Sequence, residues 1–407
     1  MNIEKQKKKI LIVMPRFPYP VTGACEQDRA EGLNIFLDLG CEIRVIAKVS
    51  PNEEGQTQEV SKKLGIKIFP ISYKFTRNLS FSKRFLKNLK RMINPLFWDG
   101  ASYEYRDKEI VNVFEKELDE FKPDVVWFEY TTLWPLYKYA RNKNIPIITR
   151  SHNFEALHFL EEEGYGPINL LRFFSKFLGE VITARKSDFL LAITPKEELL
   201  YKKIGAKKTD VLPLRRLPTF LSKEKIVLEK EKLNVFFTGS TYNVPHNMKA
   251  LKKIVFDIAP KVNKLYPGSF SFHILGAKLP QQMKKIFGGN IIYQGFVENL
   301  DQFLNDMDIA LVPSLFGAGM QQKVFEPMAR GIPTIASSRS MAGYPFENNK
   351  HILLVDNTDD FISALNRMRE YNLRKSIASE AKKLSREIFS EDKIKSVVSK
   401  SLNHVFK

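Results

Sequence analysis

Cysteine is nearly absent from this sequence, which has two among 407 residues. Cys25 and Cys41 are too few to build a disulfide framework or, by themselves, a zinc site. Long apolar runs are also missing, because no stretch approaches the roughly 20 apolar residues that a membrane-spanning helix needs. Residues 10–14 follow three lysines but are too short for the apolar region of a signal peptide. These absences favour a cytoplasmic protein in a reducing compartment.

Acidic residues are outnumbered by basic ones, since 46 Asp and Glu stand against 64 Lys and Arg, a net charge of +18. The positive electrostatic field of a protein with this net charge favours anionic partners, namely nucleotides, phosphorylated lipid headgroups or nucleic acid, without choosing among them. The composition is 43% hydrophobic and 27% charged, which is typical of a globular protein. A chain of this length favours two domains over one.

Short apolar segments alternate with helical periodicity along the chain. Residues 9–14 (KILIVM) have the unbroken apolar pattern of a strand buried on both faces, and a helix at 26–39 and a strand at 41–49 complete a βαβ unit. Similar strands are predicted at 123–130, 145–152, 188–195, 235–240, 270–276, 290–295, 308–314, 332–337 and 351–355. The pattern predicts an α/β fold with two Rossmann-like, doubly wound domains facing across a cleft.

Charge marks the expected domain boundary. Residues 219–234 (TFLSKEKIVLEKEKLN) are charged and lack a core pattern, so they are interpreted as a linker. The N-terminal domain is then 1–218, the C-terminal domain 235–388, and a last helix occupies 389–407. Ligands of open α/β sheets bind beyond the carboxyl ends of the strands, so the loops after the strands are the candidate sites.

The strongest motif is SLFGAGMQQKVFEPMARGIPTIAS at residues 314–337, which reads as strand, glycine loop, helix and strand. Gly317 and Gly319 allow close approach of a ligand to the backbone, and the helix start after them offers free amides to an anion. Lys323 and Glu326 are three residues apart and share a helix face. There Lys323 would meet a diphosphate, and Glu326 would accept two ribose hydroxyls. On spacing alone, an ordinary Lys–Glu surface pair explains the pattern equally well.

This segment resembles the donor-site signature of GT-B glycosyltransferases, in particular the retaining family 4 (glycosyltransferase group 1). That signature is Pro-Ser, a glycine turn, Lys in many members, and Glu-Ala-Met-Ala-x-Gly-x-Pro. The resemblance implies that Glu326 binds ribose and Lys323 the diphosphate. Family members often carry a further glutamate where this chain has Ala318, so backbone amides of Gly317, Ala318, Gly319 and Met320 are expected to hold the donor sugar.

Other loops of the C-terminal half are similar to the same family. In FFTGSTYNVPHN at 236–247, the resemblance places Gly239 and Ser240 at the phosphates, while Asn247 either orients a neighbour or belongs to an ordinary helix start. In QGFVENL at 294–300, it places Phe296 and Val297 near the nucleobase.

The N-terminal half resembles the acceptor side of these enzymes. In the loop at 15–33, Gly23 would face the donor phosphates and Arg16 an anion. In TRSHNFEALH at 149–158, His152 is the candidate near the reacting sugar and Glu155 a weaker acceptor-side candidate. A structural histidine and a solvated arginine explain the two positions as well. The resemblance also implies that the last helix crosses back onto the N-terminal domain.

Two further patterns leave alternatives open. Asp306 and Asp308 resemble a metal-binding Asp-x-Asp, but they end a helix and start a strand, so no metal site is expected. Residues 60–98 carry ten Lys or Arg and no acidic residue. Apolar residues at helical spacing there indicate either a basic amphipathic helix on an anionic membrane surface or a solvated helix packed on its domain, and nucleic acid is a less favoured partner.

The expected function is therefore a hexosyltransferase-type retaining glycosyltransferase. Its donor would be a nucleotide-sugar such as a UDP- or GDP-sugar, used without a metal or another cofactor. Its acceptor would be a glycan or glycolipid of the bacterial surface, reached in the cytoplasm or at the inner face of the membrane. Alternatives are an enzyme of this fold that glycosylates a protein, a small molecule or nucleic acid, a nucleotide-sugar epimerase, and a degenerate binding protein.

Overall fold

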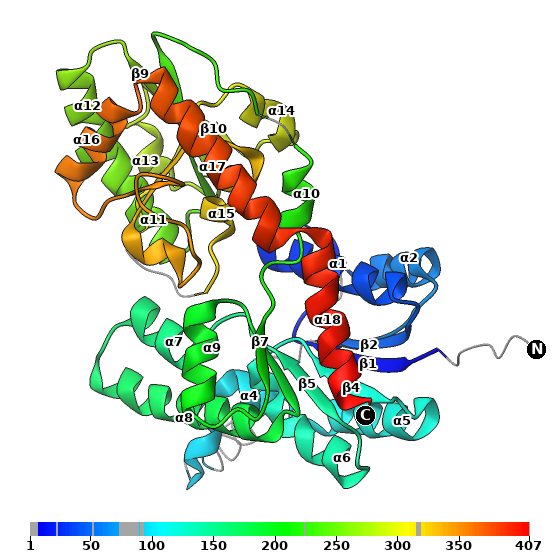
Figure 1. Cartoon of the computed structure of the whole chain (residues 1–407). Helices are drawn as coiled ribbons and strands as arrows, with labels where there is room; N and C mark the ends of the chain where they lie inside the picture. The colour runs from blue at the N-terminus through cyan, green and yellow to red at the C-terminus, as the bar shows by residue number, and fades with distance from the viewer. Residues whose placement is uncertain are drawn as a thin grey trace, which may run out of the picture. The chain divides into compact units, whose positions relative to one another are not determined.

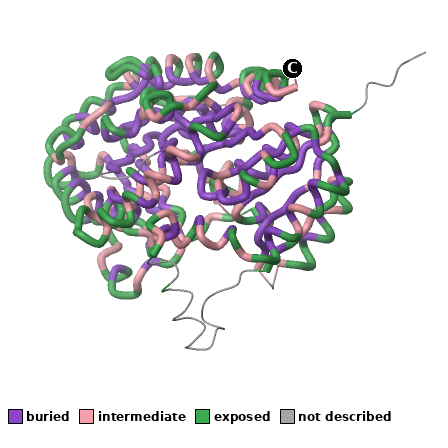
Figure 2. The backbone as a smooth tube through the Cα atoms, turned by 90° about the horizontal axis from the view of Figure 1, so that it is seen from below, coloured by how far each residue is buried: buried purple, intermediate pink, exposed green. Residues whose placement is uncertain are grey.

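The chain forms two compact units, each built around one parallel sheet (Figure 1). The computed structural model describes residues 7–21, 23–50, 53–72, 89, 93–223, 225–314 and 319–406. The N-terminal unit comprises residues 1–215 and 394–407, and the C-terminal unit residues 216–393. In both, buried strands lie inside a layer of helices with exposed outer faces (Figure 2). The predicted α/β fold with two doubly wound sheets is confirmed.

The N-terminal sheet has seven strands in the order β3-β2-β1-β4-β5-β6-β7, all parallel. Their bounds are β1 Lys9–Met14, β2 Glu42–Val49, β3 Lys67–Ser72, β4 Val125–Phe128, β5 Ile147–Arg150, β6 Phe189–Ala192 and β7 Thr209–Val211. The strand order reverses between β1 and β4, and this switch point is where open sheets of this kind bind ligands.

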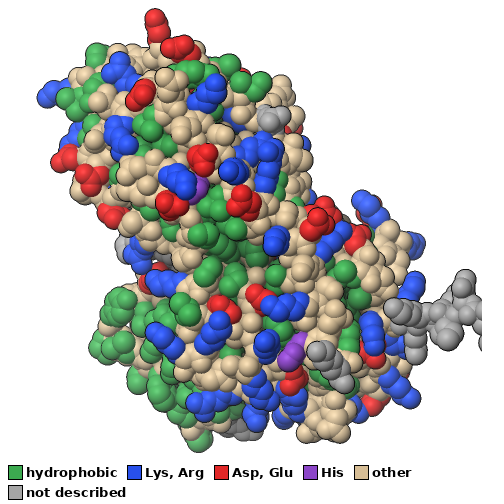
Figure 3. All heavy atoms as spheres, viewed as in Figure 1, with side chains coloured by type: hydrophobic (Ala, Val, Ile, Leu, Met, Phe, Trp, Pro, Cys, Tyr) green, Lys and Arg blue, Asp and Glu red, His purple; other side chains and the backbone are tan. Residues whose placement is uncertain are grey.

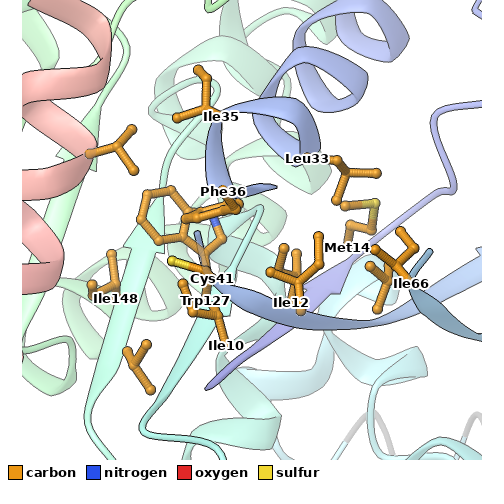
Figure 4. Packing of buried hydrophobic residues seen from close by; sticks show 14 of the residues in the cluster. Ile10, Ile12, Met14, Leu33, Ile35, Phe36, Cys41, Ile66, Trp127 and Ile148 are labelled. Carbon is orange, nitrogen blue, oxygen red and sulfur yellow. The ribbon is translucent and has the colours of Figure 1, made fainter. Parts of the chain in front are cut away.

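Helices cover both faces of this sheet. They are α1 Ala24–Asp38, α2 Glu54–Leu64, α4 Gly100–Glu104, α5 Lys108–Phe121, α6 Tyr137–Asn142, α7 Glu155–Glu163, α8 Pro167–Lys186, α9 Pro195–Lys203 and α18 Glu391–Val405, with 3₁₀ turns η3 Pro95–Phe97 and η4 Thr131–Leu136. On one face Phe36 meets Trp127 edge-on, with ring centroids 4.8 Å apart (Figure 4). Ile394 and Val398 of α18 belong to the same core, so the end of the chain helps to build the N-terminal unit.

The C-terminal sheet has six strands in the order β10-β9-β8-β11-β12-β13, again parallel. They are β8 Leu233–Thr241, β9 Phe270–Ala277, β10 Ile291–Gly295, β11 Ile309–Val312, β12 Thr334–Ala336 and β13 Leu353–Leu354. Its helical segments are α10 Leu217–Leu221, α11 Pro245–Lys252, the π-helix η5 Lys253–Ile258, α12 Ala259–Leu265, α13 Gln281–Lys284, α14 Leu300–Asn305, α15 Gln322–Arg330, η6 Ser338–Met341, α16 Thr358–Arg367 and α17 Tyr371–Phe389. Here the order reverses between β8 and β11.

Two charged segments of the sequence can now be placed. Residues 219–232 lie on the C-terminal unit, where Lys230 pairs with Asp308 at 2.8 Å and Arg374 donates to the Leu228 carbonyl at 2.9 Å. Within the basic stretch 60–98, residues 67–72 form strand β3 and therefore no helix. The helix expected around residues 81–92 lies outside the described residues, apart from position 89.

Lysine and arginine side chains are spread over the surface of both units (Figure 3). Among the described residues, no helix has both the length and the apolar character needed to cross a bilayer.

Candidate functional site

Two loops meet at the switch point of the C-terminal sheet. One follows β8 and leads into α11, and the other follows β11 and leads into α15. Lys323, in the first turn of α15, donates to Oδ1 of Asn247 on α11 at 3.2 Å. The amide nitrogen of Asn247 in turn donates to the Thr241 carbonyl at 3.0 Å. Asn247 therefore orients Lys323 and ties it to the loop after β8.

Backbone packing in the loop after β8 is unusually close. Gly276 has φ +141°, and a Cβ placed there would lie 1.8 Å from the Gly239 carbonyl oxygen. A Cβ on Gly239 would meet the Tyr242 ring at 2.8 Å, and that ring is fixed because its hydroxyl donates to the Leu275 carbonyl at 2.6 Å. Neighbouring atoms thus leave no space for a Cβ at Gly239 or Gly276. The backbone around Gly239 and Ser240 is therefore tightly constrained at the carboxyl end of the sheet.

The electrostatics of Lys323 suit an anion. Its ammonium lies 5.6 Å from the centroid of the Phe237 ring and is half-buried. Burial lowers the pKa of Lys323 to about 8, since a partly dry environment disfavours the charged form. An anion placed beside it would restore the ordinary pKa, so this lysine has more to gain from a phosphate than a solvated one.

Glu326 is held on both carboxylate oxygens. Arg330 donates to Oε1 through Nε at 3.0 Å and through a terminal nitrogen at 2.7 Å, and Gln322 donates to Oε2 at 2.9 Å. Arg330 also pairs with Asp301 on α14 at 2.7 Å. Because Glu326 is buried and its rotamer is fixed from two sides, its remaining lone pairs point in set directions.

The loop between β11 and α15 and the segment directly after β12 add buried polar atoms that lack partners among the described residues. The hydroxyls of Ser314 and Ser337 and Oε1 of Gln321 are buried and have no hydrogen-bond partner among the described residues. Such atoms are costly inside a protein unless a ligand or water satisfies them. Gly319 has φ +74° and Met320 is buried beside them. Gly317 and Ala318 lie outside the described residues.

The two residues expected near the base take different positions. Phe296, in the loop after β10, is 75% exposed, which leaves its ring free to stack. Val297 instead packs against a small core cluster that includes Phe236 and Leu304. Only Phe296 of this pair presents an open aromatic surface.

At the switch point of the N-terminal sheet lies a cluster of buried charges. Arg150, the last residue of β5, donates to both oxygens of Asp28 on α1 at 2.6 and 3.1 Å. Arg215 donates to Asp28 at 2.9 Å and to both oxygens of Glu129, after β4, at 2.7 and 2.9 Å. All four side chains are at most 2% exposed. Burial by itself raises the pKa of Asp28, but Arg150 and Arg215 outweigh it and lower that pKa to about 2.

His152 joins this cluster as a neutral ring. Arg150 lies 2.9 Å from its Nε2, Glu129 lies 3.4 Å from the same nitrogen, and the ring stacks on Tyr130. Burial and the adjacent guanidinium lower the pKa of His152 to about 4. Arg150 lies within donating distance of both ring nitrogens, 2.9 Å from Nε2 and 3.4 Å from Nδ1, so the neutral ring can accept a hydrogen bond from this guanidinium.

Asp28, Glu129 and His152 are close enough together for one metal ion, with ligand atoms within 4.8 Å of one another. The surroundings of these three residues do not fit a metal ion. Both oxygens of Asp28 and both of Glu129 already accept hydrogen bonds from Arg150, Arg215 or Trp127. Two guanidinium groups balance the two carboxylates, so a divalent cation would meet positive charge rather than free ligands.

The remaining N-terminal candidates lie on separate small networks. Glu155 begins α7 and accepts from the Tyr130 hydroxyl at 2.5 Å, while its backbone N–H donates to Glu180 at 2.9 Å. Burial and nearby Glu155 raise the pKa of Glu180 to about 8. Arg16 is exposed and pairs with Glu53 at 3.2 Å and Glu26 at 3.6 Å, so an anion would compete with two carboxylates.

Gly23 is the N-cap of α1 in extended conformation. A Cβ there would lie 2.7 Å from a carboxylate oxygen of Glu26. The structure therefore places Gly23 and Arg16 around Glu26, and it groups His152 with Asp28, Glu129, Arg150 and Arg215. Sequence reasoning missed the last four. Two of them had a local signal, namely a charged residue at or directly after the carboxyl end of an apolar strand, as in IITR for Arg150 and VVWFE for Glu129, whereas Asp28 and Arg215 had none.

The C-terminal unit matches a known family. Residues 232–370 match the family model described as Glycosyl transferases group 1. No curated protein matches the chain at a significant level.

Solved structures match over the whole chain. Sucrose-phosphate synthase from Thermosynechococcus elongatus is 14% identical, with a TM-score of 0.70 over 98% of this chain and 99% of that one. A glycosyltransferase from Rickettsia africae is 15% identical, with a TM-score of 0.68 over 99% of both chains. HepE from Anabaena in complex with UDP-glucose is 14% identical, with a TM-score of 0.61 over 97% and 99%. Identities this low establish the fold. The chain therefore has the GT-B fold of these glycosyltransferases, and its residues 232–370 match the model of the glycosyl transferases group 1 family.

Proposed function

We propose that the chain is a retaining glycosyltransferase that takes a hexose from a UDP- or GDP-sugar. The observation that carries the proposal is the pairing of Lys323 with Asn247 at the switch point of the C-terminal sheet, one turn from the braced carboxylate of Glu326. HepE, which shares the fold, has been solved with UDP-glucose. We propose that a nucleotide-sugar binds here with its diphosphate at Lys323 and its ribose hydroxyls at Glu326.

In the proposed reaction, negative charge develops on the leaving diphosphate as the sugar–oxygen bond breaks. Lys323 and the positive end of the α15 helix dipole stabilise that charge, and their fixed positions make the contribution large. Positive charge supplied in this way makes a metal ion unnecessary. The unpartnered hydroxyls of Ser314 and Ser337 are proposed to bind the phosphate or sugar oxygens.

Retention is proposed to follow a front-face route, in which the departing phosphate takes the proton of the acceptor hydroxyl. The state of His152 supports this route. A ring with a pKa of about 4, whose Nε2 accepts from Arg150, is a poor general base at neutral pH. His152 is instead proposed to donate a hydrogen bond to the sugar. Glu155 and Arg16 are proposed to contribute to the acceptor side, and Gly23 to face the donor phosphates.

The acceptor is proposed to be a glycan or glycolipid of the bacterial surface, reached at an anionic membrane. One described feature favours this over a soluble acceptor. Helices α7 and α8 and the loop between them expose large apolar side chains, among them Tyr165 at 71% and Ile168 at 68%, which form the green area over these helices in Figure 3. Co-sedimentation with phosphatidylglycerol vesicles tests this, and Ile168→Glu with Leu171→Glu should abolish it; equal sedimentation would contradict it.

The test of the donor site is a thermal-shift panel of UDP-, GDP-, ADP- and dTDP-sugars without added metal. We expect one class of donor to raise the melting temperature, and Glu326→Ala to remove the shift. No shift with any nucleotide-sugar would contradict the proposal. NMR of the product then reports the anomeric configuration. Conversion of the donor sugar without any acceptor would indicate an epimerase instead.

A further inference from the structure

A second concave surface lies on the C-terminal unit, on its own elements and away from the proposed donor loops. It is a groove of about 570 Å³ between one face of α17 and residues 225–227. The lining residues are Lys225, Ile226, Val227, Gly331, Tyr371, Lys375, Ala378, Ser379, Lys382, Lys383, Arg386 and Glu387. This volume falls within the range of small-molecule sites.

The lining is dominated by positive charge. Five of the twelve residues are Lys or Arg and one is acidic, so the groove carries a net charge of +4 (five positive minus one negative). Four of these cations lie on α17 at positions 375, 382, 383 and 386. Lys375 lies seven residues, or two helical turns, before Lys382, and Arg386 lies three or four residues after Lys383 and Lys382, so the four cations lie along one helix face. Lys and Arg side chains are visible as blue spheres beside α17 near α10 in Figure 3.

These cations are not explained by neighbouring carboxylates. Among the described residues, no carboxylate forms an ion pair with Lys225, Lys375, Lys383 or Arg386. Lys225 donates to the carbonyl of Asn305, and burial lowers its pKa. Holding several like charges in one groove is unfavourable, and a bound anion would remove both the repulsion and the desolvation cost.

The groove is also built rather than accidental. Its second wall belongs to the charged segment that separates the two sheets in the sequence, and Arg374 fixes that wall to α17 by donating to the Leu228 carbonyl at 2.9 Å. Lys382 is buried at the floor and donates to the Lys223 carbonyl at 2.7 Å. The walls are therefore held in place by buried contacts, while the ends of Lys375, Lys383 and Arg386 remain exposed.

We propose that this groove is a binding site for a ligand that carries two or more phosphate groups. Two or more phosphate groups match the number of cations and their spacing along α17. A less polar part of the same ligand can contact the apolar wall formed by Ile226 and Val227 and the ring of Tyr371. The ligand is distinct from the donor nucleotide. Gly331 caps the far end of α15, about 12 Å along the helix from Lys323.

The position of Gly331 suggests how a ligand bound in the groove would affect the proposed donor site. A Cβ on Gly331 would lie 3.3 Å from Cδ of Lys382, so the floor of the groove touches the end of the helix that carries Lys323 and Glu326. A ligand that displaces Lys382 or rigidifies α17 therefore acts on α15, the helix that also carries the proposed donor-binding residues Lys323 and Glu326.

The test is calorimetric titration of the full-length protein with tripolyphosphate at low salt. The groove variant is Lys383→Glu with Arg386→Glu, two exposed positions whose exchange should not impair folding. The control is Lys252→Glu with Lys264→Glu, which makes the same change in net charge on exposed positions of α11 and α12. We expect the groove variant to bind roughly tenfold more weakly or worse, and the control to bind like the wild type.

Lys323→Ala separates this site from the donor site. It should remove tripolyphosphate bound at the donor loops and leave the groove component, whereas the groove variant should do the reverse. A second arm replaces tripolyphosphate by phosphatidylcholine vesicles containing cardiolipin, a lipid with two phosphate groups. Weaker binding of the groove variant in the first arm indicates a soluble ligand, and weaker binding only in the second indicates a lipid headgroup. Unchanged binding in both arms, or no binding by the wild type, overturns the proposal.

Discussion

Four charged side chains lie in the interior of the N-terminal unit, where water cannot solvate them. They are those of Arg150, Arg215, Asp28 and Glu129. Each carboxylate oxygen accepts from at least one guanidinium, so removing a single partner would leave an uncompensated charge. Such a loss typically costs about 3–5 kcal/mol. The cluster also decides the state of His152, because its guanidinium groups oppose a third positive charge.

His152 should therefore make folding sensitive to mild acid. Its pKa is about 4 in the folded chain and near 6.5 when unfolded, so the unfolded state binds more protons between these values. The contribution to stability is complete above pH 6.5 and is lost as the pH falls toward 4, at most about 3 kcal/mol. Urea unfolding of wild type and His152→Gln at pH 7.5 and 4.5 measures it. Parallel pH profiles for the two proteins would contradict the neutral ring.

Lys323 should give the proposed transferase an alkaline limit. Since burial lowers its pKa to about 8, kcat/KM should fall as the pH rises through that value and the ammonium is lost. Lys323→Ala should lower turnover by roughly 10²–10³ at neutral pH. Asn247→Asp should move the limit to higher pH, because a carboxylate would replace the amide oxygen 3.2 Å from Nζ. An alkaline limit that is identical in Asn247→Asp, or full activity in Lys323→Ala, would assign the charge to another group.

At the scale of elements, helix α18 is part of the core that it covers. Ile394 is 1% exposed and packs with the cluster around Phe36 and Trp127. Ile394→Ala should lower the free energy of unfolding of the N-terminal unit by about 2–5 kcal/mol, through lost burial and a cavity. Ser396→Ala, on the exposed face of the same helix, should change it by less than about 0.5 kcal/mol. Denaturant unfolding followed by tryptophan fluorescence compares them, and equal effects would mean that α18 is not docked.

The sequence predicted all the strands that are wholly buried, and it also predicted the partly buried edge strands β10 and β13, which keep apolar runs. Strands β1, β4, β5 and β6 are almost wholly buried, so each appears as an apolar run. The edge strands β3 and β7 were missed, because exposed edges carry residues such as Lys67, Pro70 and Asp210 that break the pattern. The glycine loop and α15 were predicted from local spacing alone.

Side-chain partners far apart in sequence could not be predicted. Arg150 and Asp28 are separated by 122 residues, and Arg215 and Asp28 by 187. No periodicity in one sequence encodes such pairs, whereas the pairing of Arg330 with Glu326 is an i,i+4 contact that helix geometry allows. Local sequence patterns thus predicted most of the strands and the motif. Charge pairs between distant residues depend on the three-dimensional fold and could not be predicted in this way.

At the scale of the whole molecule, two units with separate cores predict two responses to ligand. Apart from Gly23, the proposed nucleotide residues lie within 216–393, so saturation with UDP or GDP at about 100 times its Kd should stabilise that unit by about 2.7 kcal/mol. Calorimetry should then show one unfolding transition that moves with nucleotide and another that moves with Ile394→Ala. A single transition shifted by both would show that the units unfold together.

The interrupted N-terminal unit also bears on how the chain is made. Its first 215 residues leave the ribosome long before residues 394–407, and Ile394, Val398 and Leu402 are needed to close the core around Trp127. The C-terminal unit, continuous from 216 to 393, can complete its own core during translation, whereas the N-terminal unit keeps an apolar face uncovered until residues 394–407 have been made. The half of the chain that is translated first is therefore the half that finishes folding last.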